Sequence, residues 1–331
     1  MTASRTPFTR RAALALAIGG AAAASASPLA ALAQDVRPLE WVVGYAAGGG
    51  SDAVARATAE AMAKQLGRPV IINNKPGAAT NIAADYAARS KDYGNVMLTA
   101  DFATLAANPF LFAKLSYNAE KDLAPVGLIA RFPLILVVGP QVPAKNWTEF
   151  LAWAKAQPGG VNYASAGPGS PHHLATEMLR EKSGLKLTQV PYRGAAPAMQ
   201  DVLGGSVPFM LIDTAVGTQF VLAGKVKAIG VASAQRIASL PDVPTLQEQG
   251  LADFEASAWQ GLSVPAGTPP ATIATLNQAL VEALRSDAVK ARFTALGVEA
   301  LPGSPDDMAR FVKAERERWG KLIRDNKIQL D

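Results

Sequence analysis

The chain has 331 residues, of which 49% are hydrophobic, and it contains no cysteine. The lack of thiols excludes disulfides, thiolate metal sites and cysteine catalysis. Its 32 basic and 27 acidic residues are interleaved, so the net charge of +5 gives no support to nucleic-acid binding.

Residues 1–33 have the pattern of an export signal. Three arginines precede an alanine-rich apolar stretch, and a small-residue cleavage site follows it: Arg5, Arg10 and Arg11, residues 12–26, and Ala31-Leu32-Ala33. We expect cleavage after Ala33, with twin-arginine and general secretion both open as routes. Loss of the three arginines lowers the basic count from 32 to 29, against 27 acids, and leaves a charge of +2.

The run WVVGYAAGGGSDAVAR at residues 41–56 predicts a strand, a loop at residues 44–50 and a helix that opens at Ser51-Asp52. Consecutive glycines allow a ligand to approach the backbone closely. The unpaired N–H groups and the dipole at a helix start favour an anion. An ordinary turn between a strand and a helix would have the same pattern, so this loop alone does not decide the function.

Strand-like and helix-like segments alternate along the rest of the chain, which predicts an α/β fold. The apolar runs are residues 69–72, 96–99, 134–138, 207–212 and 226–231. Helices are indicated by apolar spacing before Gly67, after Pro269 and after Ser304-Pro305. About 300 residues would usually divide into two domains.

A second loop, at residues 164–169, resembles the first. It follows a predicted strand at residues 161–163 and precedes a helix with Ser170 as its N-cap and Pro171 in its first turn. His172 and His173 come next. Two such loops, one in each domain, could hold an anion between them when the domains close.

The sequence offers little chemistry for an enzyme. Nucleotide-binding motifs and the nucleophile elbow are absent, and adjacent histidines point about 100° apart on a helix, which makes a poor metal pair. Asp101 and Asp213 follow predicted strands, where open α/β sheets bind ligands. Each is either a ligand contact or the N-cap of the next helix.

These motifs, taken in order, resemble the Bug family of periplasmic solute-binding proteins, the extracytoplasmic receptors of tripartite tricarboxylate transporters. The resemblance covers essentially the whole chain after residue 33. It rests on residues 48–52 (GGGSD), 74–78 (NKPGA), 162–167 (NYASAG), 190–194 (VPYRG), 240–245 (LPDVPT) and 265–269 (PAGTP).

The resemblance implies a two-lobed, type II periplasmic-binding-protein (Venus-flytrap) fold with two crossings between lobes. Lobe 1 would comprise residues 34–132 plus 255–331, and lobe 2 residues 133–254. The protein would be periplasmic, without a cofactor or metal, and monomeric. Its partners would be a small carboxylate and integral-membrane transporter subunits, with no nucleic acid.

The family's ligand contacts carry over to residues of both loops and three strand or helix ends. The expected contacts are Tyr45, Ala46, Ala47, Gly48, Gly49, Ser51, Asp101, Phe102, Ser165, Ala166, Gly167, His173 and Asp213. Of these, His173 would donate to a ligand carboxylate or bond locally at the helix end.

Two departures from the family pattern bear on the ligand. Ala46-Ala47 stands where prolines are usual, which predicts a less rigid loop. Asp101-Phe102 replaces small hydroxyl residues, so Asp101 would repel a second ligand carboxylate, and Phe102 would narrow the cleft or stack on a ring. We therefore expect a monocarboxylate, an aromatic acid, an amino acid or an amide-bearing acid rather than citrate.

Two other functions stay open at this point. The same fold could serve a sensor kinase instead of a permease, and the sequence does not separate these. A secreted α/β hydrolase is the remaining alternative, but it would need a nucleophile motif, a metal set or a cofactor fingerprint that the chain lacks.

Overall fold

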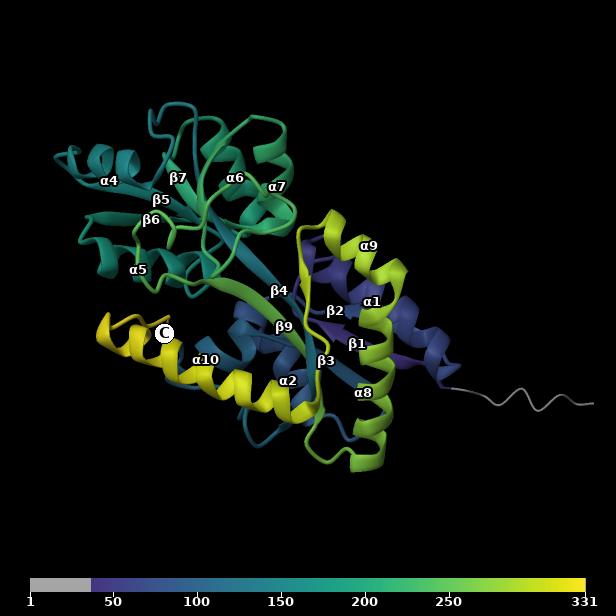
Figure 1. The fold of residues 1–331 in the computed structure, drawn as a ribbon. Helices are drawn as coiled ribbons and strands as arrows, with labels where there is room; N and C mark the ends of the chain where they lie inside the picture. Colours follow the sequence, from purple (N-terminus) through teal and green to yellow (C-terminus); the bar gives the residue numbers. More distant parts are fainter. Residues whose placement is uncertain (1–36, 331) are drawn as a thin grey trace, which may run out of the picture. The chain divides into compact units, whose positions relative to one another are not determined.

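The computed structural model describes residues 37–330 as an α/β chain (Figure 1). The strands are β1 (Leu39–Val43), β2 (Val70–Asn74), β3 (Val96–Asp101), β4 (Leu123–Val138), β5 (Val161–Ser165), β6 (Leu187–Pro191), β7 (Phe209–Asp213), β8 (Lys227–Val231), β9 (Ser257–Pro265) and β10 (Glu299–Ala300). The helices are α1 (Gly50–Leu66), α2 (Asn81–Arg89), α3 (Asn108–Leu111), α4 (Trp147–Lys155), α5 (Pro171–Ser183), α6 (Ala195–Leu203), α7 (Thr214–Leu222), α8 (Pro270–Arg285), α9 (Asp287–Ala295) and α10 (Pro305–Asp325), with a 3-10 turn η1 (Ala78–Thr80) and a π-helical turn η2 (Phe102–Ala107).

The strands run in the order β2-β1-β3-β9-β4-β7-β5-β6, with β8 and β10 also pairing with β4. The long strand β4 changes partners along its length. Up to Pro133 it pairs with β9, and from Leu134 it pairs with β7 and β8. Two sheet halves are therefore joined through β4, and Figure 1 shows β4 and β9 running through the region between them.

Each half has parallel strands followed by helices, as the alternation predicts. In the first half β1 pairs in parallel with β2 and β3, and in the second β5 pairs in parallel with β6 and β7. Parallel neighbours place their carboxyl ends at one edge. The glycine loop after β1 therefore lies near the end of β3, and the loop after β5 lies near the end of β7.

Apolar side chains of the strands and helices form the core. In the first half, Trp41 and Val43 of β1 pack in one cluster with Val54 and Met62 of α1. Burying each such side chain contributes about 1.5–3 kcal/mol. Gly67 ends α1 in the left-handed conformation at φ 61°, as its position in the sequence predicts.

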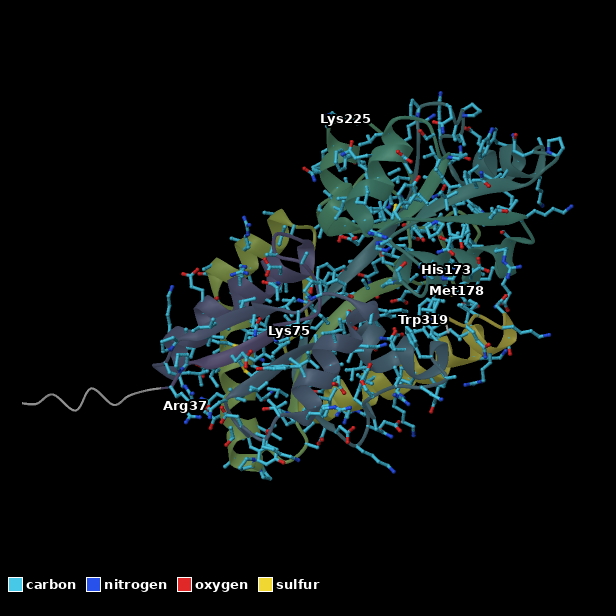
Figure 2. All side chains as sticks on the ribbon, turned by 180° about the vertical axis from the view of Figure 1, so that it is seen from behind. Arg37, Lys75, His173, Met178, Lys225 and Trp319 are labelled. Atoms are coloured by element: carbon cyan, nitrogen blue, oxygen red, sulfur yellow. The ribbon has the colours of Figure 1, made fainter. Side chains whose placement is uncertain are left out.

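Helix α10 begins where the sequence predicts. Ser304 accepts from the Asp307 N–H while Asp307 accepts from the Ser304 N–H, a reciprocal capping box. The far end of α10 lies beside α5, where Arg180 donates to Asn326 Oδ1 at 2.6 Å. Figure 2 shows Met178 and Trp319 close together in this region. Among residues 37–330, no helix is both long and apolar enough to cross a membrane.

Candidate functional site

The first glycine loop is held by the carboxylate of Asp52, which is only 2% exposed. Asp52 Oδ2 accepts from the Gly48 N–H and from Arg56 Nε, both at 2.8 Å, and its Oδ1 accepts from Asn74 Nδ2 at 2.9 Å. Burial raises the pKa of Asp52, but these hydrogen bonds outweigh it and lower the pKa below its ordinary value. An ionised Asp52 therefore fixes the loop to the first turns of α1.

The side chain of Tyr45 connects this loop to the end of β3. Its hydroxyl donates to Asp101 Oδ2, while Asp101 Oδ1 accepts from the Thr104 N–H at 2.9 Å. Burial raises the pKa of Asp101, although both hydrogen bonds oppose the rise. Tyr45 as a whole is 37% exposed, but desolvation of its hydroxyl group raises its pKa, and the charges of Asp101 and Asp213 raise it further. Asp101 is thus both the N-cap of η2 and the partner of a predicted ligand contact.

A second connection runs from α1 to the strand β9. The Ser51 hydroxyl donates to Gln260 Oε1 at 2.7 Å. Asp101 and Gln260 are paired positions of the antiparallel strands β3 and β9, so their side chains lie next to each other on one face. Gln260 was not among the ligand contacts predicted from the sequence. It could have been found as the single amide side chain within the mostly apolar residues 259–264.

The second glycine loop is bonded mainly within its own half. Ser165 Oγ accepts from Gln189 Nε2 at 2.7 Å, and the Ser165 carbonyl accepts from the Tyr192 N–H. The Ala166 carbonyl accepts from the Gly194 N–H at 3.2 Å. Ser170 caps α5 by accepting from the His173 N–H, as predicted. This loop is therefore largely buried, and its hydrogen bonds are made within the second half, although Gly169 at its end lies next to Leu111 and Leu330 of the first.

His173 also belongs to the interior of the second half. Its Nδ1 accepts from the Gly169 N–H at 3.0 Å, and the residue is buried, at the place labelled in Figure 2. Burial lowers the pKa of His173. Its Nδ1 makes the local hydrogen bond that was one of the two expectations, and donation to a ligand carboxylate stays a prediction. Its neighbour His172 instead contacts Asp213, with Nε2 3.1 Å from Oδ2, and the sequence analysis missed this pair.

Asp213 caps α7 by accepting from the Val216 N–H at 3.1 Å. The start of α7 lies against the start of α1, since a β-carbon added at Gly50 would be 3.1 Å from the Ala215 β-carbon. Because Asp213 is the N-cap of α7 and Ser51 lies in the first turn of α1, this approach brings polar groups of both halves near each other. They are the pairs Tyr45–Asp101, Ser51–Gln260 and His172–Asp213.

Phe102 requires a correction. Its side chain is 1% exposed and makes edge-on contacts with Trp259 and Trp319, at centroid distances of 6.4 Å and 5.2 Å. The residue after Asp101 begins the turn η2, which directs this ring into the core. Phe102 therefore neither narrows a cleft nor offers its ring to a ligand. Ala46, Ala47, Gly48 and Gly49 are exposed, as backbone contacts for a ligand require.

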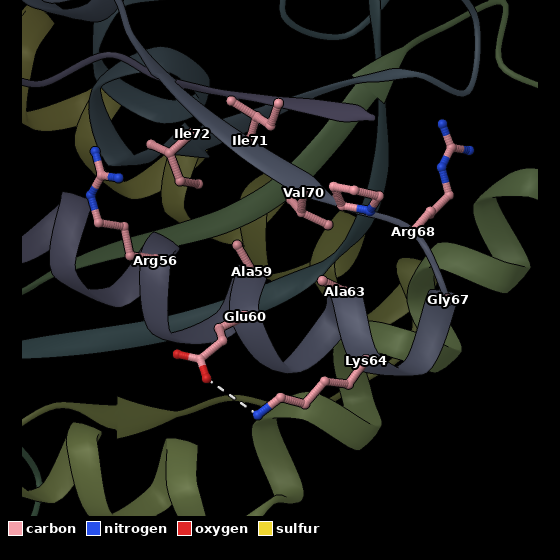
Figure 3. Close-up of a pocket in the computed structure, with 11 residues that line it drawn as sticks. Arg56, Ala59, Glu60, Ala63, Lys64, Gly67, Arg68, Val70, Ile71 and Ile72 are labelled. Carbon is pink, nitrogen blue, oxygen red and sulfur yellow. Dashed lines mark hydrogen bonds and ion pairs between the residues drawn. The ribbon is translucent and has the colours of Figure 1, made fainter. Parts of the chain in front are cut away.

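A groove of about 810 Å³ lies elsewhere, between α1 and the edge strand β2 (Figure 3). Its lining includes Ala59, Ala63 and Ile71, and none of the predicted contacts takes part. Arg68 on its rim is already bonded to Asn95 at 2.8 Å. Within residues 37–330, no group of three or more His, Asp or Glu side chains is arranged to hold a metal ion.

The fold and the paired polar groups at the strand ends define a class, the α/β periplasmic binding proteins. The chain matches the model of the tripartite tricarboxylate transporter family receptor over residues 54–328, and it belongs to that family. The family is one of binding proteins and not of enzymes. Both the fold class and the family inferred from the sequence are confirmed.

Three solved structures are similar over nearly their whole length. The periplasmic binding protein BugD is 34% identical, with a TM-score of 0.80 over 89% of this chain and 99% of that one. Rpa4515 of R. palustris, solved with adipate, is 30% identical, with a TM-score of 0.83 over 89% and 99%. MatC of Rhodopseudomonas palustris, with bound malate, is 35% identical, with a TM-score of 0.78 over 87% and 99%.

Proposed function

We propose that this protein captures a small carboxylate between its two halves and delivers it to a tripartite tricarboxylate-type membrane carrier. The observation that carries the proposal is the close approach of the start of α1, at Gly50, to the start of α7, at Ala215, beside the Tyr45–Asp101 and Ser51–Gln260 pairs. Family relatives from R. palustris bound to adipate and malate support the ligand class.

The first loop supplies the anion-binding groups. Helix α1 has Gly49 as its N-cap and no side-chain cap, so N–H groups of its first turn are available to a ligand oxygen. The loop from Tyr45 to Gly49 is exposed next to them. A carboxylate held there gains hydrogen bonds and the favourable end of the helix dipole.

Capture involves closure of two lobes, residues 34–132 with 255–331 and residues 133–254. The change of partners in β4 between Pro133 and Leu134 supports a hinge at this position. Strand β9 begins at Ser257 on the second crossing, directly opposite Pro133. A bound ligand that contacts both lobes would stabilise the closed form, which docks on the carrier.

Export precedes this function. The predicted signal at residues 1–33 lies outside the described residues, so cleavage after Ala33 stays a prediction. Mass spectrometry of the protein recovered from the periplasm should find Gln34 at its amino terminus. A protein retained in the cytoplasm with its arginines intact would contradict it.

Calorimetry of the purified protein tests the binding function. We expect heat of binding and a higher Tm with small carboxylates, and neither effect with their methyl esters. A ligand at 100 times its Kd stabilises by about 2.7 kcal/mol. If the protein is folded by circular dichroism but no carboxylate from a panel of mono-, di- and aromatic acids binds, the proposal is wrong.

A further inference from the structure

We propose that Gln260 and the Tyr45–Asp101 pair form a subsite for a carboxamide at the end of the ligand remote from its carboxylate. The inference rests on the function proposed above and concerns the choice among carboxylates. Neither the family assignment nor the ligands of the relatives indicates such a group. The subsite consists of a donor, the Gln260 amide on β9, and an acceptor, the hydroxyl of Tyr45 in the loop after β1.

The donor is the side-chain amide of Gln260, a residue 2% exposed. The Ser51 hydroxyl occupies its Oε1, which orients the amide, and its Nε2 has no hydrogen-bond partner among the described residues. A buried donor without a partner destabilises the folded protein. An oxygen of the ligand would remove that cost, so the site favours a ligand with a carbonyl at this point.

The acceptor is the hydroxyl oxygen of Tyr45. Because the Tyr45 proton is donated to Asp101, the oxygen keeps its lone pairs for a ligand N–H. The buried charge of Asp101 polarises the Tyr45 hydroxyl through their hydrogen bond, which makes the Tyr45 oxygen a stronger hydrogen-bond acceptor. The oxygens of Asp101 already accept from Tyr45 and Thr104. Tyr45 is also the more exposed of the two residues, so its oxygen is the acceptor that faces the ligand.

The donor and the acceptor lie side by side. Asp101 and Gln260 are Cα partners of the antiparallel strands β3 and β9, and directly opposed side chains in such pairs have β-carbons about 4.5–5.5 Å apart. Their partners are Tyr45, in the loop after β1, and Ser51, in the first turn of α1. This loop and helix start therefore bring both groups to the same end of the site.

A carboxamide matches this arrangement because it has one C=O and one NH₂ group on the same carbon. A carboxylate has acceptors only, so it would satisfy Gln260 but face the oxygen of Tyr45 and the charge of Asp101. A methyl group would leave the Gln260 amide unpaired. Sites built to hydrogen-bond a polar group reject analogues that lack it by large factors.

Calorimetry with three matched ligand series tests the subsite. The series are the diacids from succinate to adipate, their monoamides, and the monoacids of equal length. We expect the best monoamide to bind the wild-type protein at least tenfold more tightly than the matched diacid and monoacid. Equal affinity across a matched set would overturn the inference while the receptor function stands.

Two variants test whether the preference for monoamides comes from this subsite. Gln260→Met keeps the length of the side chain without a donor, and Tyr45→Phe removes the acceptor oxygen. Each should lower monoamide affinity more than monoacid affinity, so that the preference for the monoamide over the matched monoacid falls about tenfold. Gln278→Met, on the exposed face of α8, is the matched control and should change nothing.

The outcomes separate the two proposals. If Gln260→Met does not fold, the wild-type series and Tyr45→Phe still decide the question. A monoamide preference that survives both variants would overturn the assignment to this subsite. Failure of a folded wild-type protein to bind any member of the three series would overturn the inference, and failure with the aromatic acids as well would contradict the receptor function.

Discussion

The two glycine loops have similar sequences but are stabilised in different ways. The first, residues 44–50, is exposed from Tyr45 to Gly49 and is held by side chains of other elements, such as Asn74. The second, residues 164–169, is largely buried and bonded to its own half. The helix after the first loop has no side-chain cap, whereas Ser170 caps the helix after the second.

This difference indicates a division of roles. A loop whose backbone groups are exposed next to an uncapped helix start has hydrogen-bonding capacity left for a ligand. A buried loop with satisfied groups instead fixes the position of its neighbours. We infer that the first loop binds the carboxylate and that the second forms a rigid wall beside it.

The largest expected effect is on the free energy of unfolding, when one glycine of each loop is replaced by alanine. Gly169 has φ 73°, and an added β-carbon would lie 2.6 Å from Leu111 Cδ1. Gly169→Ala should therefore lower the free energy of unfolding by about 2–4 kcal/mol, from backbone strain and overpacking together. Gly48 has φ 86° but open space around it, so Gly48→Ala should cost only about 1–2 kcal/mol. Urea denaturation measures both, and equal losses would contradict a rigid second loop.

Removing the charge of Asp101, which bonds Tyr45 of the first loop, should change which carboxylates the protein prefers. Asp101→Asn should raise the affinity for diacids such as adipate about tenfold, or about 1.4 kcal/mol, because a like charge is lost. Calorimetry with adipate and hexanoate measures the change. Asp201→Asn, which alters the partner of Tyr192 near the second loop, is the control. An unchanged adipate affinity in Asp101→Asn would show that Asp101 does not select against diacids.

The two loops should also respond to different pH ranges. The pKa of His173 is lowered by burial, so its contribution to stability is present above about pH 6.5 and is lost as the pH falls towards the folded-state pKa. The pKa of Asp52 is lowered as well, and its contribution is lost only as the pH falls below about 3.9. His173→Asn should flatten the upper step of Tm against pH, and Asp52→Asn the lower one. If the curve of Tm against pH has one step and neither variant changes it, His173 and Asp52 do not cause the pH dependence.

The smallest expected effect concerns the helix caps. Gly49 has extended angles, and a side chain there would be 3.7 Å from its nearest neighbour. Gly49→Ser should stabilise the free protein by a few tenths of a kcal/mol and weaken carboxylate binding, because the new hydroxyl competes for the same N–H groups. Ser170→Ala should lower stability by about 1 kcal/mol with little change in binding. Tighter binding by Gly49→Ser would argue against a ligand at the start of α1.

Much of the fold could be predicted from local patterns. The start and cap of α5 at Ser170, the start of α10 after Ser304 and the end of α1 at Gly67 all match the predictions made from the sequence. These features depend on groups within three or four residues of each other. The polar partners in the site could not be predicted in this way, because Ser51 and Gln260 are 209 positions apart.

The partners of the two histidines also could not be predicted from local sequence patterns. The sequence places His172 and His173 in one helical turn, but only the packing of α5 against β7 and the start of α7 decides that His172 meets Asp213. His173 points instead to the backbone of its own loop. A rotation of about 100° between neighbours on a helix separates the two environments.

The sequence by itself determined the α/β class, the two strand–glycine loop–helix units and the family, since these follow from periodicity, turn chemistry and motif order. Only the tertiary structure decided which loop keeps free hydrogen-bonding groups and which residues lie next to Asp101. The physical reason is that strand register and helix packing are set by contacts between distant segments. The register of β3 with β9 placed the unpaired amide of Gln260 beside the Tyr45–Asp101 pair.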